Sequence, residues 1–318
     1  ALAADPAAAA ATALPAGCAL ESEWARMRVT ERGWRVTAIN QGYELCETYP
    51  TSLVVPAAVT DDALSAAAAF RSKGRVPALT WLHPLTGAAV CRSAQPLAGI
   101  SISQIASRHR NAEDERLVAA IAAAANAAAG GHRPFLIVDC RSRVAATGNA
   151  VMGKGTENEL VYADACSRSG GARVVHLDIA NIHAVRGSYL RLHELLRSTA
   201  GGSKHDASFL SSLHDSEWLA HVASLLKGAS CAAHAVGAHG RSLLVHCSDG
   251  WDRTAQISIL VQLLLDPHYR TLDGLAALLQ KDLLAFGHKC AERLGHAAGG
   301  PSTHEWSPIV LQLLDAIH

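Results

Sequence analysis

Short apolar runs alternate with helical patterns along most of this chain, and that alternation limits the folds it can adopt. Runs typical of buried strands lie at residues 78–82, 135–138, 174–177 and 243–245. Helical spacing of apolar residues is found between and after them, at residues 113–129, 188–196, 217–236, 255–265, 272–286 and 305–317. Continuous apolar strands are usually covered on both faces, so the pattern predicts an α/β sheet with helices on both faces.

The first 20 residues differ in composition from the rest of the chain. They are rich in Ala and Pro and have neither helical nor alternating periodicity, which is typical of a disordered segment. Beyond them we find no internal repeat and no linker between domains. The sequence therefore predicts a low-complexity lead-in over residues 1–20 and one folded domain over residues 21–318.

Charge and cysteine usage narrow the function classes. The formal net charge is zero, with 28 basic and 28 acidic residues, so the overall charge does not favour nucleic acid and any anion site must be local. The 8 cysteines are scattered singly, without Cys-x-x-Cys pairs. This spacing favours reduced thiols in a cytosolic compartment.

Two further site classes are not expected. The longest apolar run, at residues 257–265, is much shorter than the roughly 20 residues that span a bilayer, so we expect membrane contact to be peripheral. The 17 histidines form no His-Glu-x-x-His motif and no zinc-finger spacing. We therefore expect neither a bound metal nor a cofactor.

The most informative segment is a predicted strand followed by the loop from Cys247 to Arg253 and then by a predicted helix. A loop that closes into a helix N-terminus can turn successive backbone N–H groups towards an anion, and the helix dipole adds positive potential. The same field favours the thiolate form of Cys247, which makes it a candidate nucleophile towards phosphorus. Arg253 presents a planar fork for two phosphoryl oxygens. Thr254 could donate its hydroxyl to the Cys247 sulfur, and Ser248 could add polar contacts.

The spacing of Cys247 and Arg253 leaves an alternative open. A single buried cysteine is usually part of the packing, and an arginine six positions later can be a surface residue. The strand–loop–helix context favours the phosphate loop over this alternative.

The string His246-Cys247-Ser248-Asp249-Gly250-Trp251-Asp252-Arg253-Thr254 resembles the signature of the myotubularin family of phosphoinositide 3-phosphatases. Further strings resemble landmarks of that family: Phe70-Arg71-Ser72-Lys73-Gly74-Arg75, Ser93-Ala94-Gln95-Pro96, Asp178-Ile179-Ala180-Asn181-Ile182-His183 and Phe286-Gly287-His288-Lys289. The resemblance implies a tyrosine-phosphatase-like domain with a central mixed sheet. It also implies hydrolysis of phosphatidylinositol 3-phosphate and its 3,5-bisphosphate through a cysteinyl-phosphate intermediate, without metal.

By resemblance, the nucleophile is Cys247, the phosphate-binding arginine is Arg253 and the general acid is Asp252. Tyrosine phosphatases supply the acid from a Trp-Pro-Asp loop, and this chain contains no such string. Asp249 is the alternative acid, and Asp252 could instead only cap the next helix. The remaining loop residues that the resemblance assigns to substrate binding are Ser248, Asp249, Gly250, Trp251 and Thr254.

Outside the loop, the family's substrate contacts correspond to Asn149, Asn181, Ile182, Lys289 and Arg293. Lys289 and Arg293 are four residues apart, so on a helix they share one face and could meet phosphate groups. The alternative is a solvated basic face. Glu292, at a position where the family more often has a neutral residue, is expected to weaken anion binding slightly.

The family normally has a lipid-binding domain before the catalytic domain and further residues after it, so we interpret the chain as a fragment. We expect it to act on phosphoinositide in a membrane surface and not on nucleic acid, and to form a homodimer or a heterodimer with a related family member. The expected location is cytoplasmic, peripheral on endosomal or other intracellular membranes. Two other functions stay open: an inactive phosphoinositide-binding partner and a protein tyrosine phosphatase.

Overall fold

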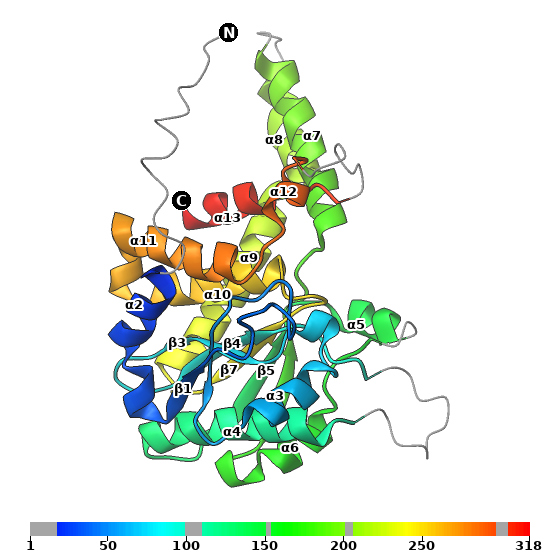
Figure 1. Cartoon of the computed structure of the whole chain (residues 1–318). Helices are drawn as coiled ribbons and strands as arrows, with labels where there is room; N and C mark the ends of the chain where they lie inside the picture. Colours follow the sequence, from blue (N-terminus) through cyan, green and yellow to red (C-terminus); the bar gives the residue numbers. More distant parts are fainter. Residues whose placement is uncertain (1–17, 99–109, 151–153, 201–205, 297–304) are drawn as a thin grey trace.

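A five-stranded sheet lies between two layers of helices (Figure 1). The structure is a computed structural model that describes residues 18–98, 110–150, 154–200, 206–296 and 305–318. The strand order is β3-β4-β7-β5-β6, with β3 antiparallel to β4 and the other neighbours parallel. This arrangement confirms the predicted α/β class and the central mixed sheet. The predicted lead-in at residues 1–20 falls mostly outside the described residues.

The strands of the main sheet are β3 (Ala78–Leu82), β4 (Ala89–Ser93), β5 (Phe135–Asp139), β6 (Ala172–His176) and β7 (Leu243–His246). A separate antiparallel pair consists of β1 (Trp34–Thr37) and β2 (Leu53–Pro56). Every residue of β3, β4, β5 and β7 is buried, which is the burial that the apolar runs at β3, β5 and β7 predict.

Helices cover both faces of the sheet. In Figure 1, α9, α10 and α11 lie on one side of it, and α3, α4 and α6 lie on the other. The α-helices are α2 (Cys18–Met27), α3 (Asp61–Ala68), α4 (Ala112–Ala129), α5 (Arg143–Ala150), α6 (Glu159–Ala165), α7 (Ile182–Ala200), α8 (Asp206–Asp215), α9 (Trp218–Gly237), α10 (Arg253–Leu265), α11 (Leu272–Leu279), α12 (Cys290–Arg293) and α13 (Ile309–Ile317). None of the helices in the described ranges is long and apolar enough to span a bilayer.

Most predicted elements are present, with shifted ends. The four predicted strands correspond to β3, β5, β6 and β7, whereas β4 was not predicted. Helix α7 begins six residues before the predicted start at Ser188, and the predicted helix over 272–286 divides into α11 and a π-helical turn, Gln280–Ala285. At the start of α9, the Ser216 hydroxyl accepts from the Trp218 amide at 3.3 Å.

Helix α10 is the central helix of the domain. Its residues from Thr254 to Gln262 are buried without interruption, so this part of the helix has no face turned to solvent. It packs against α9, β7 and β4. Strand β7 therefore leads through one loop directly into α10, at the edge where the parallel strands end, which is the usual ligand-binding edge of such sheets.

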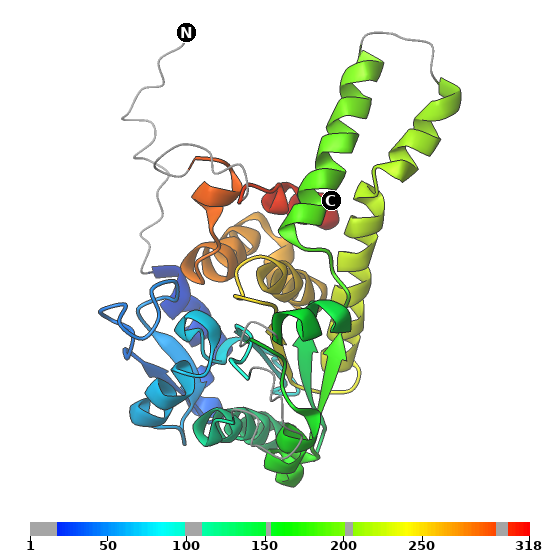
Figure 2. The same cartoon turned by 90° about the vertical axis from the view of Figure 1, so that its right-hand side faces the viewer.

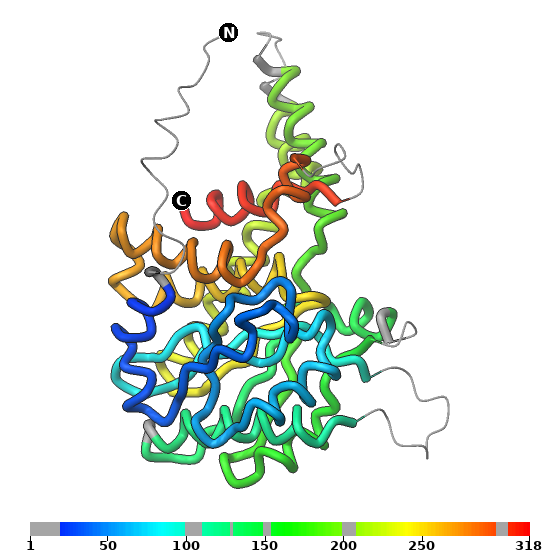
Figure 3. The backbone as a smooth tube through the Cα atoms, in the orientation of Figure 1, coloured from blue at the N-terminus to red at the C-terminus, as the bar shows by residue number. Residues whose placement is uncertain are grey.

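Helices α7 and α8 form an arm that extends away from the sheet, and α9 leads back from this arm to the sheet (Figure 2). Near the start of the chain, α2 lies beside the region of α11 (Figure 3). The ion pair between Arg26 of α2 and Asp266 joins these distant segments at 2.9 Å, and Trp81 Nε1 donates to the same carboxylate at 3.0 Å.

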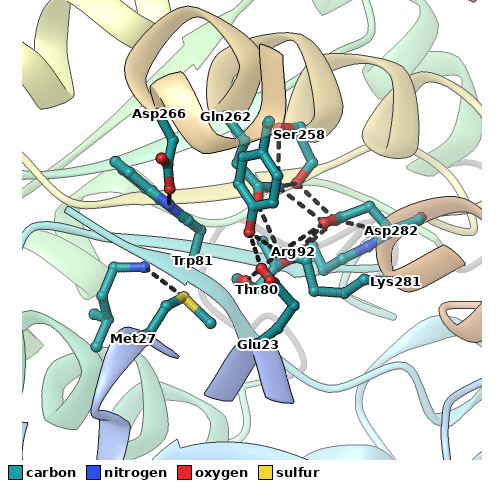
Figure 4. A network of polar contacts seen from close by, with 12 residues as sticks. Glu23, Met27, Thr80, Trp81, Arg92, Ser258, Gln262, Asp266, Lys281 and Asp282 are labelled. Carbon is teal, nitrogen blue, oxygen red and sulfur yellow. Dashed lines mark hydrogen bonds and ion pairs between the residues drawn. The ribbon is translucent and has the colours of Figure 1, made fainter. Parts of the chain in front are cut away.

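A buried polar network connects the sheet to α10 and the π-helical turn (Figure 4). Asp282 accepts from Thr80 of β3 at 2.7 Å, from Ser258 at 2.9 Å and from Gln262 at 2.9 Å. Two fully buried cations, Arg92 at 3.1 Å and Lys281 at 3.2 Å, pair with the same carboxylate. Burial opposes the ionised form of Asp282, but Lys281 and Arg92 outweigh burial and lower its pKa.

We expect Asp282→Ala to destabilise the domain strongly. The change leaves Arg92 and Lys281 buried beside each other without their shared anion, a situation that typically costs about 3–5 kcal/mol. Denaturant unfolding of both proteins measures the difference in free energy. Asp273→Ala, on the exposed side of α11, is the control with an expected change below about 0.5 kcal/mol. Similar small losses in both variants would contradict the importance of the network.

Candidate active site

The loop from Cys247 to Arg253 connects the end of β7 to the first residue of α10. Cys247 has only 4% of its surface exposed and is a free thiol. Arg253 is half-buried, and its Nη1 donates to the Ile179 carbonyl at 3.2 Å. The two predicted functional side chains thus lie at opposite ends of a loop that closes into a helix N-terminus.

Backbone carbonyls of this loop are bonded to groups outside it. The Ser248 carbonyl accepts from the Gln95 amide at 3.0 Å, and the Gly250 carbonyl accepts from Arg75 at 3.0 Å and Arg92 at 2.9 Å. Histidines bond two further carbonyls of the loop: His246 Nδ1 donates to the Cys247 carbonyl at 3.2 Å, and His288 Nδ1 donates to the Trp251 carbonyl at 3.2 Å.

The direction of the loop's N–H groups follows from these bonds. In a trans peptide, the C=O group and the N–H group of the next residue point in opposite directions. The N–H groups of Ser248, Asp249, Trp251 and Asp252 are therefore turned away from the anchoring groups. Several N–H groups turned to one side of a short loop form an anion-binding concavity.

Gly250 is required at the centre of this loop. Its φ angle is +76°, and a Cβ atom added there would lie 2.5 Å from the Ser93 carbonyl oxygen. Because that neighbour is backbone of strand β4, it cannot move aside easily. A larger residue would strain the loop both through its φ angle and through this contact.

His246 and Glu157 form a buried pair below the loop. His246 Nε2 lies 2.9 Å from Glu157 Oε2, and both side chains are fully buried. Burial opposes the charged imidazolium, but Glu157 and Asp139 outweigh burial and raise the pKa of His246. Both ring nitrogens can then donate, one to Glu157 and the other to the Cys247 carbonyl. Glu157 also pairs with Arg71 at 2.6 Å.

We expect the His246–Glu157 pair to stabilise the domain in a pH-dependent way. Because the pKa is raised on folding, the contribution is complete below pH about 6.5 and is lost as the pH rises through the pKa of the folded protein. The gap in unfolding free energy between wild type and His246→Asn then narrows towards alkaline pH. His193→Asn, at an exposed histidine of α7, is the control. A gap that does not change with pH would contradict the charged form of His246.

The two candidate acids have different partners. Asp252 is mostly buried, and its two carboxylate oxygens accept from Arg293 Nε at 2.9 Å and Nη2 at 3.0 Å. His288 Nδ1 lies 3.3 Å from the same carboxylate. Asp249 is half-buried and accepts from the Ser72 hydroxyl at 2.7 Å. The two carboxylates are thus held by different segments of the chain.

The structure separates Lys289 from Arg293. Lys289 Nζ lies 5.0 Å from the centre of the Trp251 ring and 3.5 Å from Glu292, and it remains partly exposed. Arg293 is buried between Asp252 and Glu305, and these carboxylates outweigh burial and raise its pKa. The expected shared basic face is therefore not formed: Arg293 supports the loop carboxylate, and Lys289 lies beside the loop's tryptophan.

The other predicted contacts are positioned as follows. The Asn181 side chain caps α7 by accepting from the His183 amide at 3.1 Å, and the Ile182 carbonyl accepts from Ser307 at 2.8 Å. The Asn149 side chain lies outside the described part of the structure. Thr254 Oγ1 is buried and has no hydrogen-bond partner among the described residues, so the expected bond to the Cys247 sulfur is not formed.

Sequence reasoning missed the residues that hold the loop from behind. They are Arg75, Arg92, Glu157 and His288. Two of them, Arg75 and His288, stand in strings that resemble family landmarks, which was the available signal. Their action depends on the sheet register and on burial, which local sequence does not give. No group of three or more metal-ligating side chains is found among the described residues.

A buried thiol at the end of a parallel strand, a loop of oriented N–H groups and an arginine at the start of the next helix define a domain of the cysteine-phosphatase type. The model of the myotubularin-like phosphatase domain matches residues 11–318. The chain therefore belongs to the myotubularin-like phosphatase family.

Relatives at about two-fifths identity agree with this assignment. Myotubularin of Xenopus laevis is 40% identical over 296 residues, which are 93% of this chain and 46% of the relative. Two Mus musculus proteins, phosphatidylinositol-3,5-bisphosphate 3-phosphatases MTMR2 and MTMR6, are each 40% identical over 93% and 94% of this chain, covering 43% and 45% of their own lengths. The chain thus spans less than half the length of these relatives.

Proposed function

We propose that this chain is a phosphoinositide 3-phosphatase that hydrolyses phosphatidylinositol 3-phosphate and phosphatidylinositol 3,5-bisphosphate. The observation that carries the proposal is the loop of oriented N–H groups with Cys247 at one end and Arg253 at the other. The names of the mouse relatives, which specify 3-phosphatase activity on the bisphosphate, support the choice of substrate.

The reaction has two steps. The Cys247 thiolate attacks phosphorus in line, the bond from phosphorus to the inositol oxygen breaks, and a carboxylic acid protonates that leaving oxygen. Water then attacks the cysteinyl phosphate and releases inorganic phosphate and the thiolate. The N–H groups of the loop and the Arg253 guanidinium bind the phosphoryl oxygens, whose charge distribution changes in the transition state.

Asp252 is the proposed acid, with Asp249 as the alternative. Asp252 belongs to the loop and adjoins Arg253, and its ion pair with Arg293 fixes the orientation of its carboxylate. The proposed setting is peripheral on endosomal or other intracellular membranes, where this lipid substrate is accessible. Association with a second copy or a related family member remains a prediction.

Phosphate release from a panel of soluble short-chain phosphoinositides tests the function directly. We expect turnover of the 3-phosphate and the 3,5-bisphosphate, and much less from a phosphotyrosine peptide. Cys247→Ser should remove turnover while substrate binding persists, because a serine hydroxyl is not ionised near neutral pH. Cys231→Ser, at an exposed thiol, is the matched control with unchanged activity.

Residual turnover above about 10% in Cys247→Ser would rule out this nucleophile. A preference for the phosphotyrosine peptide would favour the protein tyrosine phosphatase. Binding of phosphoinositide without turnover by the wild-type chain would favour the inactive partner.

The acid assignment predicts a dependence on the leaving group. An inositol alkoxide leaves poorly without a proton, whereas a phenolate leaves readily. We expect Asp252→Asn to slow phosphoinositide turnover by roughly 10²–10⁴ and aryl phosphate turnover much less. Asp249→Asn is the matched variant on the same loop. If the substrate-dependent loss follows Asp249 instead, that residue is the acid.

The position of Lys289 beside the loop predicts that substitutions of Lys289 and Glu292 change kcat/KM for the bisphosphate selectively. Lys289→Ala should lower kcat/KM for the 3,5-bisphosphate about tenfold to a hundredfold, at about 1.4 kcal/mol per factor of ten, and should spare an aryl phosphate. Glu292→Gln removes the competing anion 3.5 Å from Lys289 and should raise kcat/KM for the bisphosphate.

Arg293→Ala is the contrasting variant for Lys289→Ala. Because Arg293 pairs with Asp252, its loss should affect every substrate whose leaving group needs a proton. Added salt should reduce the effect of Lys289→Ala, since that charge is partly exposed. Equal losses on bisphosphate and aryl phosphate in Lys289→Ala would contradict a substrate contact.

A further inference from the structure

Two buried guanidinium groups meet at one backbone oxygen of the loop. Arg75 Nη2 donates to the Gly250 carbonyl at 3.0 Å, and Arg92 Nη2 donates to the same oxygen at 2.9 Å. Both arginine side chains have no exposed surface. A single neutral carbonyl needs no more than one hydrogen bond to be satisfied, so two cations on it suggest a further role.

The charges of the two arginines are balanced differently. Arg92 pairs with the Asp282 carboxylate at 3.1 Å. Arg75 donates instead to uncharged oxygens, namely the Thr48 carbonyl and hydroxyl and the Gly250 and Phe286 carbonyls. Within the described ranges, no carboxylate pairs with Arg75, and its Nε has no hydrogen-bond partner.

Burying a cation costs free energy unless an anion nearby neutralises its charge. Burial, together with the like charge of Arg92, lowers the pKa of Arg75. The Arg75 Nε lies 3.3 Å from the position that a Cβ of Gly250 would take, so the guanidinium lies directly behind the loop. The nearest place for a compensating anion is therefore the loop itself, which binds phosphate in the proposed function.

We propose that Arg75 is a positioning residue whose unneutralised charge sets the anion affinity of the Cys247–Arg253 loop. Arg75 holds the Gly250 carbonyl by a hydrogen bond, so the Trp251 N–H points away from Arg75. The Arg75 guanidinium also supplies positive potential that a bound phosphate dianion neutralises. This inference rests on the proposed function, because it concerns the same anion site. It differs from the role of Arg253, since Arg75 acts through the loop and does not need to touch substrate.

Calorimetric binding of inorganic tungstate, a phosphate-like dianion, tests the role without a lipid substrate. We expect Arg75→Met, which keeps the length but not the charge, to weaken tungstate binding about tenfold to a hundredfold. Arg75→Lys keeps the charge and should remain within about fivefold of wild type. Arg35→Met, at a half-buried arginine of β1 that bonds Val59 and Asp61, is the control with unchanged affinity.

A second pair of variants neutralises Arg75 without removing it. Thr48 Oγ1 accepts from Arg75 Nη1 at 2.8 Å and is half-buried. Thr48→Asp would give Arg75 a carboxylate, whereas Thr48→Asn has the same size without charge. We expect tungstate to bind about tenfold more weakly to the Asp variant than to the Asn variant. This pair keeps the test valid if Arg75→Met does not fold.

Three results would each overturn the inference. Arg75→Met could bind tungstate as tightly as wild type, or Arg75→Met and Arg75→Lys could weaken binding equally. The third is equal tungstate affinity in the two Thr48 variants. None of these results would affect the proposed function, because the wild-type site would still bind the anion. If wild type itself binds no tungstate, the anion site fails and the inference fails with it.

Discussion

The orientation of backbone N–H groups in the loop after β7 is the constraint on which the site depends. Hydrogen bonds from the surrounding fold fix the peptides of this loop. Strand β4 supplies the close carbonyl of Ser93, the residues directly after it supply the Gln95 amide, and the segment after α11 supplies His288. Arg75 and Arg92 complete the set. The geometry of the anion site is therefore a property of three separate segments of the chain.

Buried ion pairs connect these segments to the core. Arg71, Arg92 and Arg141 are fully buried, and each pairs with a buried carboxylate: Asp114 and Glu157, Asp282, and Asp139, respectively. Such pairs contribute little net stability compared with apolar packing, yet removing one partner is costly because the other charge stays buried. Their value here is geometric, since a guanidinium fork fixes the direction of the groups it bonds. Arg75 differs from these three arginines, because among the described residues it bonds only uncharged oxygens.

The pairing of Asp252 with Arg293 joins the loop to the segment around α12. The spacing of Lys289 and Arg293 suggested two equivalent cations facing substrate. The short helix α12 instead directs Arg293 into the protein, where Asp252 and Glu305 surround it. Only Lys289 remains beside the loop and partly exposed. The two basic residues therefore have different surroundings: Arg293 is paired inside the protein, and Lys289 lies at the surface beside Trp251.

The sequence by itself determined the α/β class, four strands of the main sheet and the identity of the loop, because these depend on local periodicity and on a contiguous string. Cys247 and Arg253 are six residues apart in one segment, so their positions at the two ends of the loop follow from the sequence alone. The tertiary structure decided which groups hold that loop. Arg75, Arg92 and His288 bond the loop from distant segments, and Glu157 bonds His246 just before it. The partners of these residues depend on strand register and burial, which no local pattern specifies. The same reason separates Lys289 from Arg293: helical spacing gives the distance between two side chains, but only the packing around a helix decides which of them faces the interior.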